Sequence, residues 1–206
     1  MESIDVKYDY AFTGAALKFH DFMRLAYHVK NTDSFDSLDG LDPNEIMRRE
    51  NKRTNKREFQ ELVKRYSNLT MEQKYLITEV DIESQKHLSL LAICKTYRII
   101  RDFLSEVVRE KLLLMENKLE EGHYNSFLNR KKDMHPELDK FSDSTEKKAR
   151  QVTWRILEEA GIINNTKEKV IIPQFLSSDV INKIVHDDPN LLKVFLMNDQ
   201  ELKLPI

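Results

Sequence analysis

The chain has 206 residues, 40% of them apolar, and it carries 33 Lys plus Arg against 35 Asp plus Glu, for a formal net charge of −2. This composition predicts a globular protein with a proper core and excludes a disordered chain or a basic arm. Because the net charge is slightly negative, a nucleic-acid partner can be argued only from local clusters of positive charge.

Four glycines, five prolines and a high density of charge predict a mainly helical, all-α protein. The first residues carry acids where a signal peptide needs positive charge, and no apolar stretch approaches the ~18 residues of a membrane span. The single cysteine, Cys94, lies in an apolar run that is typical of a buried thiol. We therefore expect a cytoplasmic protein with no membrane partner.

The first predicted helix begins near Lys18, after a Thr-Gly loop. Asp42 is predicted to cap a short helix over 43–51 with Pro43 at its first position. Thr54 is predicted to cap a longer helix with an apolar face on Phe59, Leu62, Val63 and Tyr66. Residues 43–66 thus have the pattern of a helix-turn-helix.

Positive charge gathers in this region. Residues 48–65 hold eight Lys or Arg against three Glu, a local charge of +5. Such a face is often merely solvated, but it also suits contact with phosphates. The candidate DNA-binding residues from this cluster are Arg53, Lys56 and Arg57.

Residues 84–115 continue the helical period through apolar side chains and predict a central buried helix or helix pair. The pattern changes after that point, where Gly122 and Pro136 bracket a further helix. We therefore place a domain boundary near residue 116, with an N-terminal helical domain over 1–115 and a C-terminal domain over 116–206.

The stretch "SDSTEKKARQVTWRILEEAGII" predicts a helix with a cap at Asp143 or Ser144 and a left-handed stop at Gly161. The following "IINNTKEKVIIPQF" predicts a small β-hairpin, and two short helices complete the chain. Helix, short helix, capped helix and hairpin are the element order of a winged helix-turn-helix, in which the third helix enters the major groove.

On this helix, five positions are predicted to face the core: Ala149, Val152, Ile156, Leu157 and Ala160. The candidate DNA-binding residues on the open side are Lys147, Lys148, Gln151 and Arg155, with Lys167 and Lys169 on the wing. The plain alternative is a solvated helix face. Trp154 lies off the apolar stripe, and packing beneath the wing is favoured over a partner-facing role.

The sequence has no glycine-rich phosphate loop, no zinc-binding histidine motif and no paired cysteines, and its six histidines are scattered. Acids adjoin His20 and His186, as chance predicts at this charge density. We therefore expect no catalytic residue, no metal and no cofactor, and a protein that is not an enzyme.

The order "FTGAALKFHDFMRLA", "IIRDFLSEVVREKLLL" and "HPELDKFSDSTEKKARQVTWRILEEAGII" resembles the BrxA family of BREX phage-defence systems over about residues 10–198. The matching elements are Thr13-Gly14, Asp102-Phe103, Val107 through Glu110, and Ser144-Thr145 through Gly161. The resemblance implies a small, helical, non-enzymatic DNA-binding component encoded beside larger BREX proteins. It assigns no individual base-reading residue.

The expected function is therefore binding of double-stranded DNA within a BREX assembly, mainly through phosphates and with modest sequence preference. Two alternatives stay open. One is a protein-interaction scaffold that contacts other BREX proteins. The other is a structured-RNA binder, although no aromatic stacking platform is evident.

Overall fold

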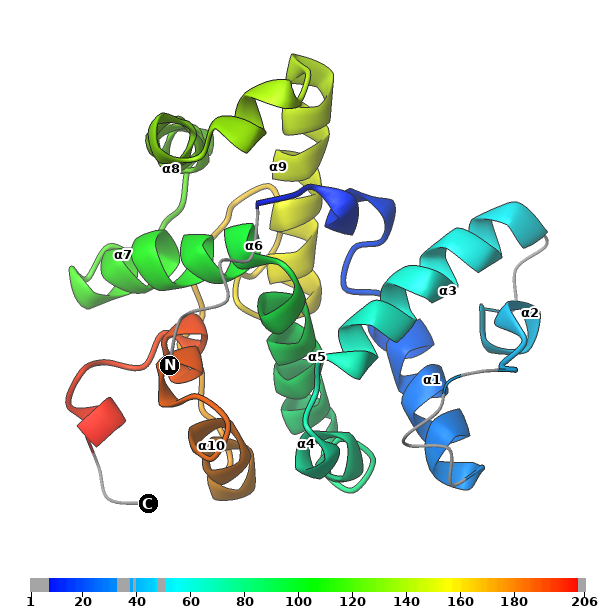
Figure 1. The fold of residues 1–206 in the computed structure, drawn as a ribbon. Helices are drawn as coiled ribbons and strands as arrows, with labels where there is room; N and C mark the ends of the chain where they lie inside the picture. The colour runs from blue at the N-terminus through cyan, green and yellow to red at the C-terminus, as the bar shows by residue number, and fades with distance from the viewer. Residues whose placement is uncertain (1–7, 33–37, 39, 48–50, 204–206) are drawn as a thin grey trace.

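The computed structural model describes residues 8–32, 38, 40–47 and 51–203, and these residues form helices without any extended β-ladder (Figure 1). The all-α prediction is confirmed at this level. The α-helices are α1 (Phe19–Asn31), α2 (Pro43–Met47), α3 (Lys52–Ser67), α4 (Met71–Leu76), α5 (Ile82–Thr96), α6 (Arg98–Phe103), α7 (Arg109–Leu113), α8 (Glu121–Met134), α9 (Asp143–Glu159) and α10 (Ser178–Val185). Four 3₁₀ turns, η1 (Ala11–Gly14), η3 (Pro136–Lys140), η4 (Pro189–Phe195) and η5 (Glu201–Lys203), and a π turn, η2 (Leu104–Val108), complete the described elements.

Helix α5 lies at the centre of the molecule and is buried on almost every side (Figure 1). Helices α1 and α3 pack on one side of it, and α10 and η4 pack on another. The η1 segment contacts both α3 and α9 and so links these two helices. This position of η1 matters for the candidate site.

The start of α3 differs from the prediction. Asn51, not Thr54, is the N-cap, because the Asn51 side chain accepts a hydrogen bond from the Thr54 backbone amide at 3.1 Å. The expected first helix is confirmed, since α1 begins at Phe19 after Lys18 in a left-handed conformation. The predicted helix over 43–51 is described as α2 to Met47, and residues 48–50 lie outside the described residues.

The central region is divided where Tyr97 is extended, with φ −124° and ψ 100°. The buried Tyr97 ring lies edge-on to Phe12, at 5.7 Å between centroids. The chain then resumes as α6, the π turn and α7. Of the two alternatives predicted for this region, the helix pair therefore agrees better with the structure than a single helix does.

In the C-terminal part, α8, η3 and α9 are followed by a loop that turns back on itself. Ser142 caps α9, one residue before the predicted cap, while Gly161 has the predicted positive φ of 77°. The predicted β-hairpin is not confirmed, because the segment forms only isolated antiparallel bridges, Ile163 with Ile171 and Lys118 with Val170. The side-chain oxygens of Asn164 and Asn165 accept hydrogen bonds from backbone amides of the 164–170 loop. These hydrogen bonds close the loop, which contains no strand.

Buried apolar side chains form one cluster that extends from Tyr8 to Leu196. Residues on both sides of position 116 contribute to it. The division into domains 1–115 and 116–206, with a helix-turn-helix at 43–66, therefore stays a prediction.

Candidate nucleic-acid interface

Helix α9 has one buried and one exposed face. All five predicted core positions are buried, with exposed fractions between 0% and 6%: Ala149, Val152, Ile156, Leu157 and Ala160. The opposite side carries the exposed side chains of Lys147, Lys148, Gln151 and Arg155, which we call the α9 face. The sequence thus predicted correctly which residues point outward.

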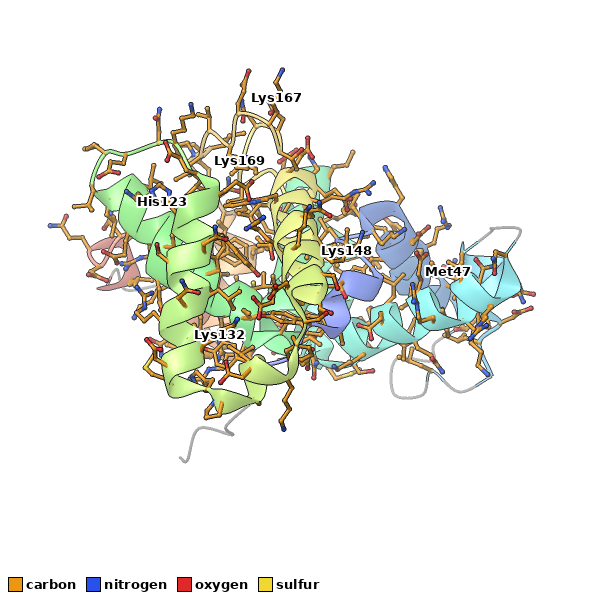
Figure 2. The ribbon with its side chains drawn as sticks, turned by 90° about the horizontal axis from the view of Figure 1, so that it is seen from above. Met47, His123, Lys132, Lys148, Lys167 and Lys169 are labelled. Atoms are coloured by element: carbon orange, nitrogen blue, oxygen red, sulfur yellow. The ribbon has the colours of Figure 1, made fainter. Side chains whose placement is uncertain are left out.

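The α9 face lies beside the 164–170 loop on one surface of the molecule (Figure 2). In that view Lys148 projects from α9, and Lys167 lies at the tip of the loop. Arg155 pairs with Glu159 one turn later, with Nε and Oε1 3.0 Å apart, and its side chain is still 69% exposed. Cationic and amide groups at these positions can donate hydrogen bonds to phosphates or to base edges.

Trp154 packs beneath this loop, as favoured from the sequence. Its ring is 3% exposed and lies 5.5 Å from Phe103 and 6.0 Å from Tyr124, between ring centroids. The ammonium of Lys169 lies 5.5 Å from the Trp154 ring centroid and 3.1 Å from a Glu121 carboxylate oxygen. Lys169 therefore anchors the loop to α8 and α9, whereas Lys167 is exposed at the tip.

The predicted basic cluster over residues 48–65 exposes less positive charge than its local charge of +5 indicates. Arg53, Lys56 and Arg57 are exposed on α3, but Arg65 is 1% exposed. Arg48 and Arg49 fall outside the described residues. The three candidate DNA-binding residues of α3 are thus available to solvent, while part of the counted charge belongs to the interior.

A cleft of about 410 Å³ brings the two predicted clusters together. We call it the η1 cleft, because η1 and the residues after it lie between its walls on α3 and α9. Arg57 comes from α3, whereas Lys148, Gln151 and Arg155 come from α9. The remaining lining residues are Thr13, Gly14, Ala15, Ala16, Lys18, Glu58 and Val152.

The backbone between α3 and α9 is held by a buried arginine. The Arg65 guanidinium donates to the Ala16 carbonyl oxygen at 2.6 Å and also to that of Ala15. Burial lowers the pKa of Arg65 below its usual value. On the other side, the Lys18 backbone amide donates to a Glu159 carboxylate oxygen at 2.9 Å. Arg65 and Glu159 thus fix the segment against both helices.

A second buried network ties the first described residues to the centre of the fold. Asp102 accepts a hydrogen bond from the Tyr8 hydroxyl and lies 3.2 Å from the Lys131 ammonium. Burial alone would raise the pKa of Asp102, but the Tyr8 hydroxyl and the positive charge of Lys131 and Arg101 bring it below its usual value. This network is structural, and sequence spacing gave no signal for it.

Reactive chemistry is not apparent in the described residues. No group of three or more His, Cys, Asp or Glu among them could hold a metal ion. Burial raises the pKa of the Cys94 thiol, which disfavours the nucleophilic thiolate. No described helix is both long and apolar enough to cross a membrane.

One protein-family model matches most of the chain. The model for BrxA matches residues 6–188. The chain belongs to the BrxA family. The resemblance noted in the sequence is therefore confirmed, and the matched range includes the α9 face, the η1 cleft and the 164–170 loop of this BrxA-family chain.

Two curated relatives are named BREX protein BrxA. The relative from Bacillus cereus (strain H3081.97) is 37% identical over 114 residues, covering 53% of this chain and 57% of the relative. The relative from Escherichia coli O9:H4 (strain HS) is 29% identical over 94 residues, covering 46% of this chain and 44% of the relative. The matched stretches span about half the length of these BrxA proteins.

A solved structure has the same fold. It is the crystal structure of an uncharacterized protein from Magnetospirillum magneticum, with a TM-score of 0.75 and 18% sequence identity. The match covers 92% of this BrxA-family chain and 98% of that chain. At this identity the likeness establishes the fold alone.

Proposed function

We propose that this chain binds double-stranded DNA through the α9 face and the tip of the 164–170 loop. The observation that carries the proposal is the outward row of Lys147, Lys148, Gln151 and Arg155 on a helix whose other side is buried. A helix about 10–12 Å wide fits the major groove, and these side chains can contact phosphates and base edges.

The order of elements supports a winged-helix mode of binding. The bridge at Lys118 precedes α8, η3 and α9, and the bridge between Ile163 and Ile171 follows at the base of the loop. A winged helix-turn-helix has strands at the corresponding places, whereas the described residues here form only single bridges. In this proposal α9 is the recognition helix, and the exposed Lys167 contacts the DNA backbone.

Membership of a BREX phage-defence system is part of the proposal. It is supported by the BrxA family match and by the two relatives that carry the name BREX protein BrxA. We further propose that the chain acts by binding and not by catalysis. Arg53, Lys56 and Arg57 would extend the contact to the DNA backbone, and phosphate contacts would supply most of the affinity.

A second candidate function is protein interaction within the same assembly. It is favoured by an exposed apolar end of α7, where Leu114 is 66% and Met115 is 91% exposed. Exposed apolar groups of this kind are common at protein interfaces. A scaffold of this type needs neither the α9 face nor salt-sensitive binding to DNA.

The test is a competition assay with duplex DNA and structured RNA of equal length and charge. We expect the folded chain to bind labelled duplex and to be displaced more readily by duplex than by RNA. Replacing Lys147, Lys148 and Arg155 together by Ala should weaken duplex binding while the melting temperature stays nearly unchanged. Normal duplex binding by this triple variant would favour the scaffold, and preferential displacement by RNA would favour an RNA partner.

A further inference from the structure

The η1 cleft contains four positively charged side chains, which differ in how they are neutralised. Lys18 lies 3.2 Å from the Glu58 carboxylate, and Arg155 lies 3.0 Å from that of Glu159. Arg57 and Lys148 form no ion pair or hydrogen bond with any residue that the structure describes. These two unpaired cations line the same cleft from its α3 and α9 walls.

The position of Arg57 is set by the backbone beneath it. A Cβ built on Gly14 would lie 3.9 Å from the Arg57 Nε atom, so the guanidinium lies directly over η1. The segment below cannot easily shift, because Arg65 binds the carbonyls of Ala15 and Ala16 from the interior. The Arg57 guanidinium thus lies over a backbone segment that Arg65 holds in place.

The cleft suits a phosphate group that is part of a larger molecule. Its volume of about 410 Å³ exceeds what a single phosphate needs, and the cleft opens beside the α9 face, with which it shares Lys148, Gln151 and Arg155. A guanidinium can form two parallel hydrogen bonds to phosphate oxygens, and an ammonium supplies a point charge.

We propose that the η1 cleft binds one phosphate of the DNA backbone between Arg57 and Lys148, and so joins α3 to the α9 face in a single interface. The proposal rests on the proposed function, because it places a strand of the bound duplex across the cleft. It makes η1, which carries the Thr13-Gly14 element, part of the interface although η1 itself supplies no positive charge.

The experiment measures duplex affinity by fluorescence anisotropy at several salt concentrations for Arg57→Gln, Lys148→Gln and the double variant. Each single change should weaken binding about tenfold at low salt and lower the salt slope by about 1. If both side chains hold the same phosphate, the double variant should lose less than the product of the two single losses. The matched control is Lys64→Gln, which removes an exposed charge from α3 outside the cleft.

The outcomes distinguish failure of DNA binding from failure of the cleft assignment. If the unmodified chain does not bind duplex, the proposed function fails, and this inference fails with it. If the chain binds duplex but Arg57→Gln and Lys148→Gln behave like Lys64→Gln, the cleft assignment alone is overturned. Inorganic phosphate provides the last arm: if it raises the melting temperature of the unmodified chain but not of Arg57→Gln, while both bind duplex equally, the cleft holds a free anion and not the backbone.

Discussion

Neighbouring residues of α9 belong to different environments, so single substitutions can separate binding from folding. Arg155 is exposed, and its ion pair with Glu159 is of the i,i+4 type, which contributes only about 0.3–0.5 kcal/mol at a surface. Ile156, the next residue, is 0% exposed. The same helix therefore offers a test residue and its internal comparison.

We expect Arg155→Ala to change the free energy of unfolding by less than about 0.5 kcal/mol. It should weaken duplex binding by about 1–3 kcal/mol if Arg155 contacts a base, and by less if it contacts only phosphate. Ile156→Ala should cost about 2–5 kcal/mol of stability through a core cavity and should impair binding only by unfolding. Urea denaturation and anisotropy on both variants measure these effects, and a large stability loss in Arg155→Ala contradicts the assignment of an open face.

Asp102 gives a prediction for the dependence of stability on pH. Its folded-state pKa is below the unfolded value of about 3.9, so its contribution is fully present above pH ~4 and is lost as the pH falls through the folded-state pKa. We expect Asp102→Asn to reduce the free energy of unfolding at pH 7 by about 2 kcal/mol, because Lys131 loses one of its two carboxylate partners and keeps Glu106 at 2.6 Å.

The difference between Asp102→Asn and the unmodified chain should shrink as the pH is lowered below ~4. Urea unfolding midpoints at pH 7, 5 and about 3.5 measure this difference. A gap that stays constant over the series would mean that the Asp102 carboxylate does not carry the effect. Duplex binding at pH 7 serves as the control, since Tyr8, Asp102 and Lys131 neither belong to the α9 face nor line the η1 cleft.

At the scale of elements, the segment from η1 to Lys18 depends on one interior side chain. Arg65→Lys keeps the positive charge but replaces the planar guanidinium by a compact ammonium group. The carbonyl oxygens of Ala15 and Ala16 then no longer both receive their present hydrogen bonds. We expect a loss of about 2 kcal/mol in the free energy of unfolding.

The same substitution should speed hydrogen exchange at the amides of Thr13 and Ala15, which donate to the carbonyl oxygens of Tyr10 and Phe12. The Ile181 amide at the start of α10 is the internal control and should exchange at an unchanged rate. Faster exchange throughout the chain would point to global destabilisation and would not support a local role for Arg65.

The sequence predicted α9 better than it predicted the cleft, for physical reasons. The period of 3.6 residues determines which side chains of α9 face the core, and Gly161 marks its end. Caps were less certain, because "SDST" and "NKRT" each offer several side-chain acceptors within a few residues. The η1 cleft needs Gly14, Arg57 and Lys148 to meet, and no local pattern encodes contacts across 134 positions of sequence.

The predicted hairpin over 162–175 is not confirmed, because its arms form a single bridge and no strands. The branched residues on either side of Asn164 and Asn165 predict a hairpin, yet Val170 bridges to Lys118 and the Asn side chains close the loop. Local propensity indicated that the two arms pair, and they do so through the Ile163–Ile171 bridge and the Asn164 and Ile172 backbone amides. It did not indicate the additional bridge from Val170 to Lys118. Likewise the count of charges over 48–65 could not reveal that Arg65 turns inward to bind the backbone of another segment.

At the scale of the whole molecule, binding to DNA depends on how charge is distributed. The net charge of −2 gives no general attraction to DNA, so binding must come from the α9 face, the tip of the loop and the η1 cleft. If these cations neutralise about six phosphates, the logarithm of affinity should fall with the logarithm of salt concentration with a slope near −5.

The most direct test of the central claim is the affinity of the unmodified chain for duplex DNA over a fourfold range of salt concentration. The account predicts a loss of about three decades of affinity over that range, with little difference between duplexes of unrelated sequence. Binding that does not change with salt, or no measurable binding at low salt, would contradict the proposal that this chain is a DNA-binding protein.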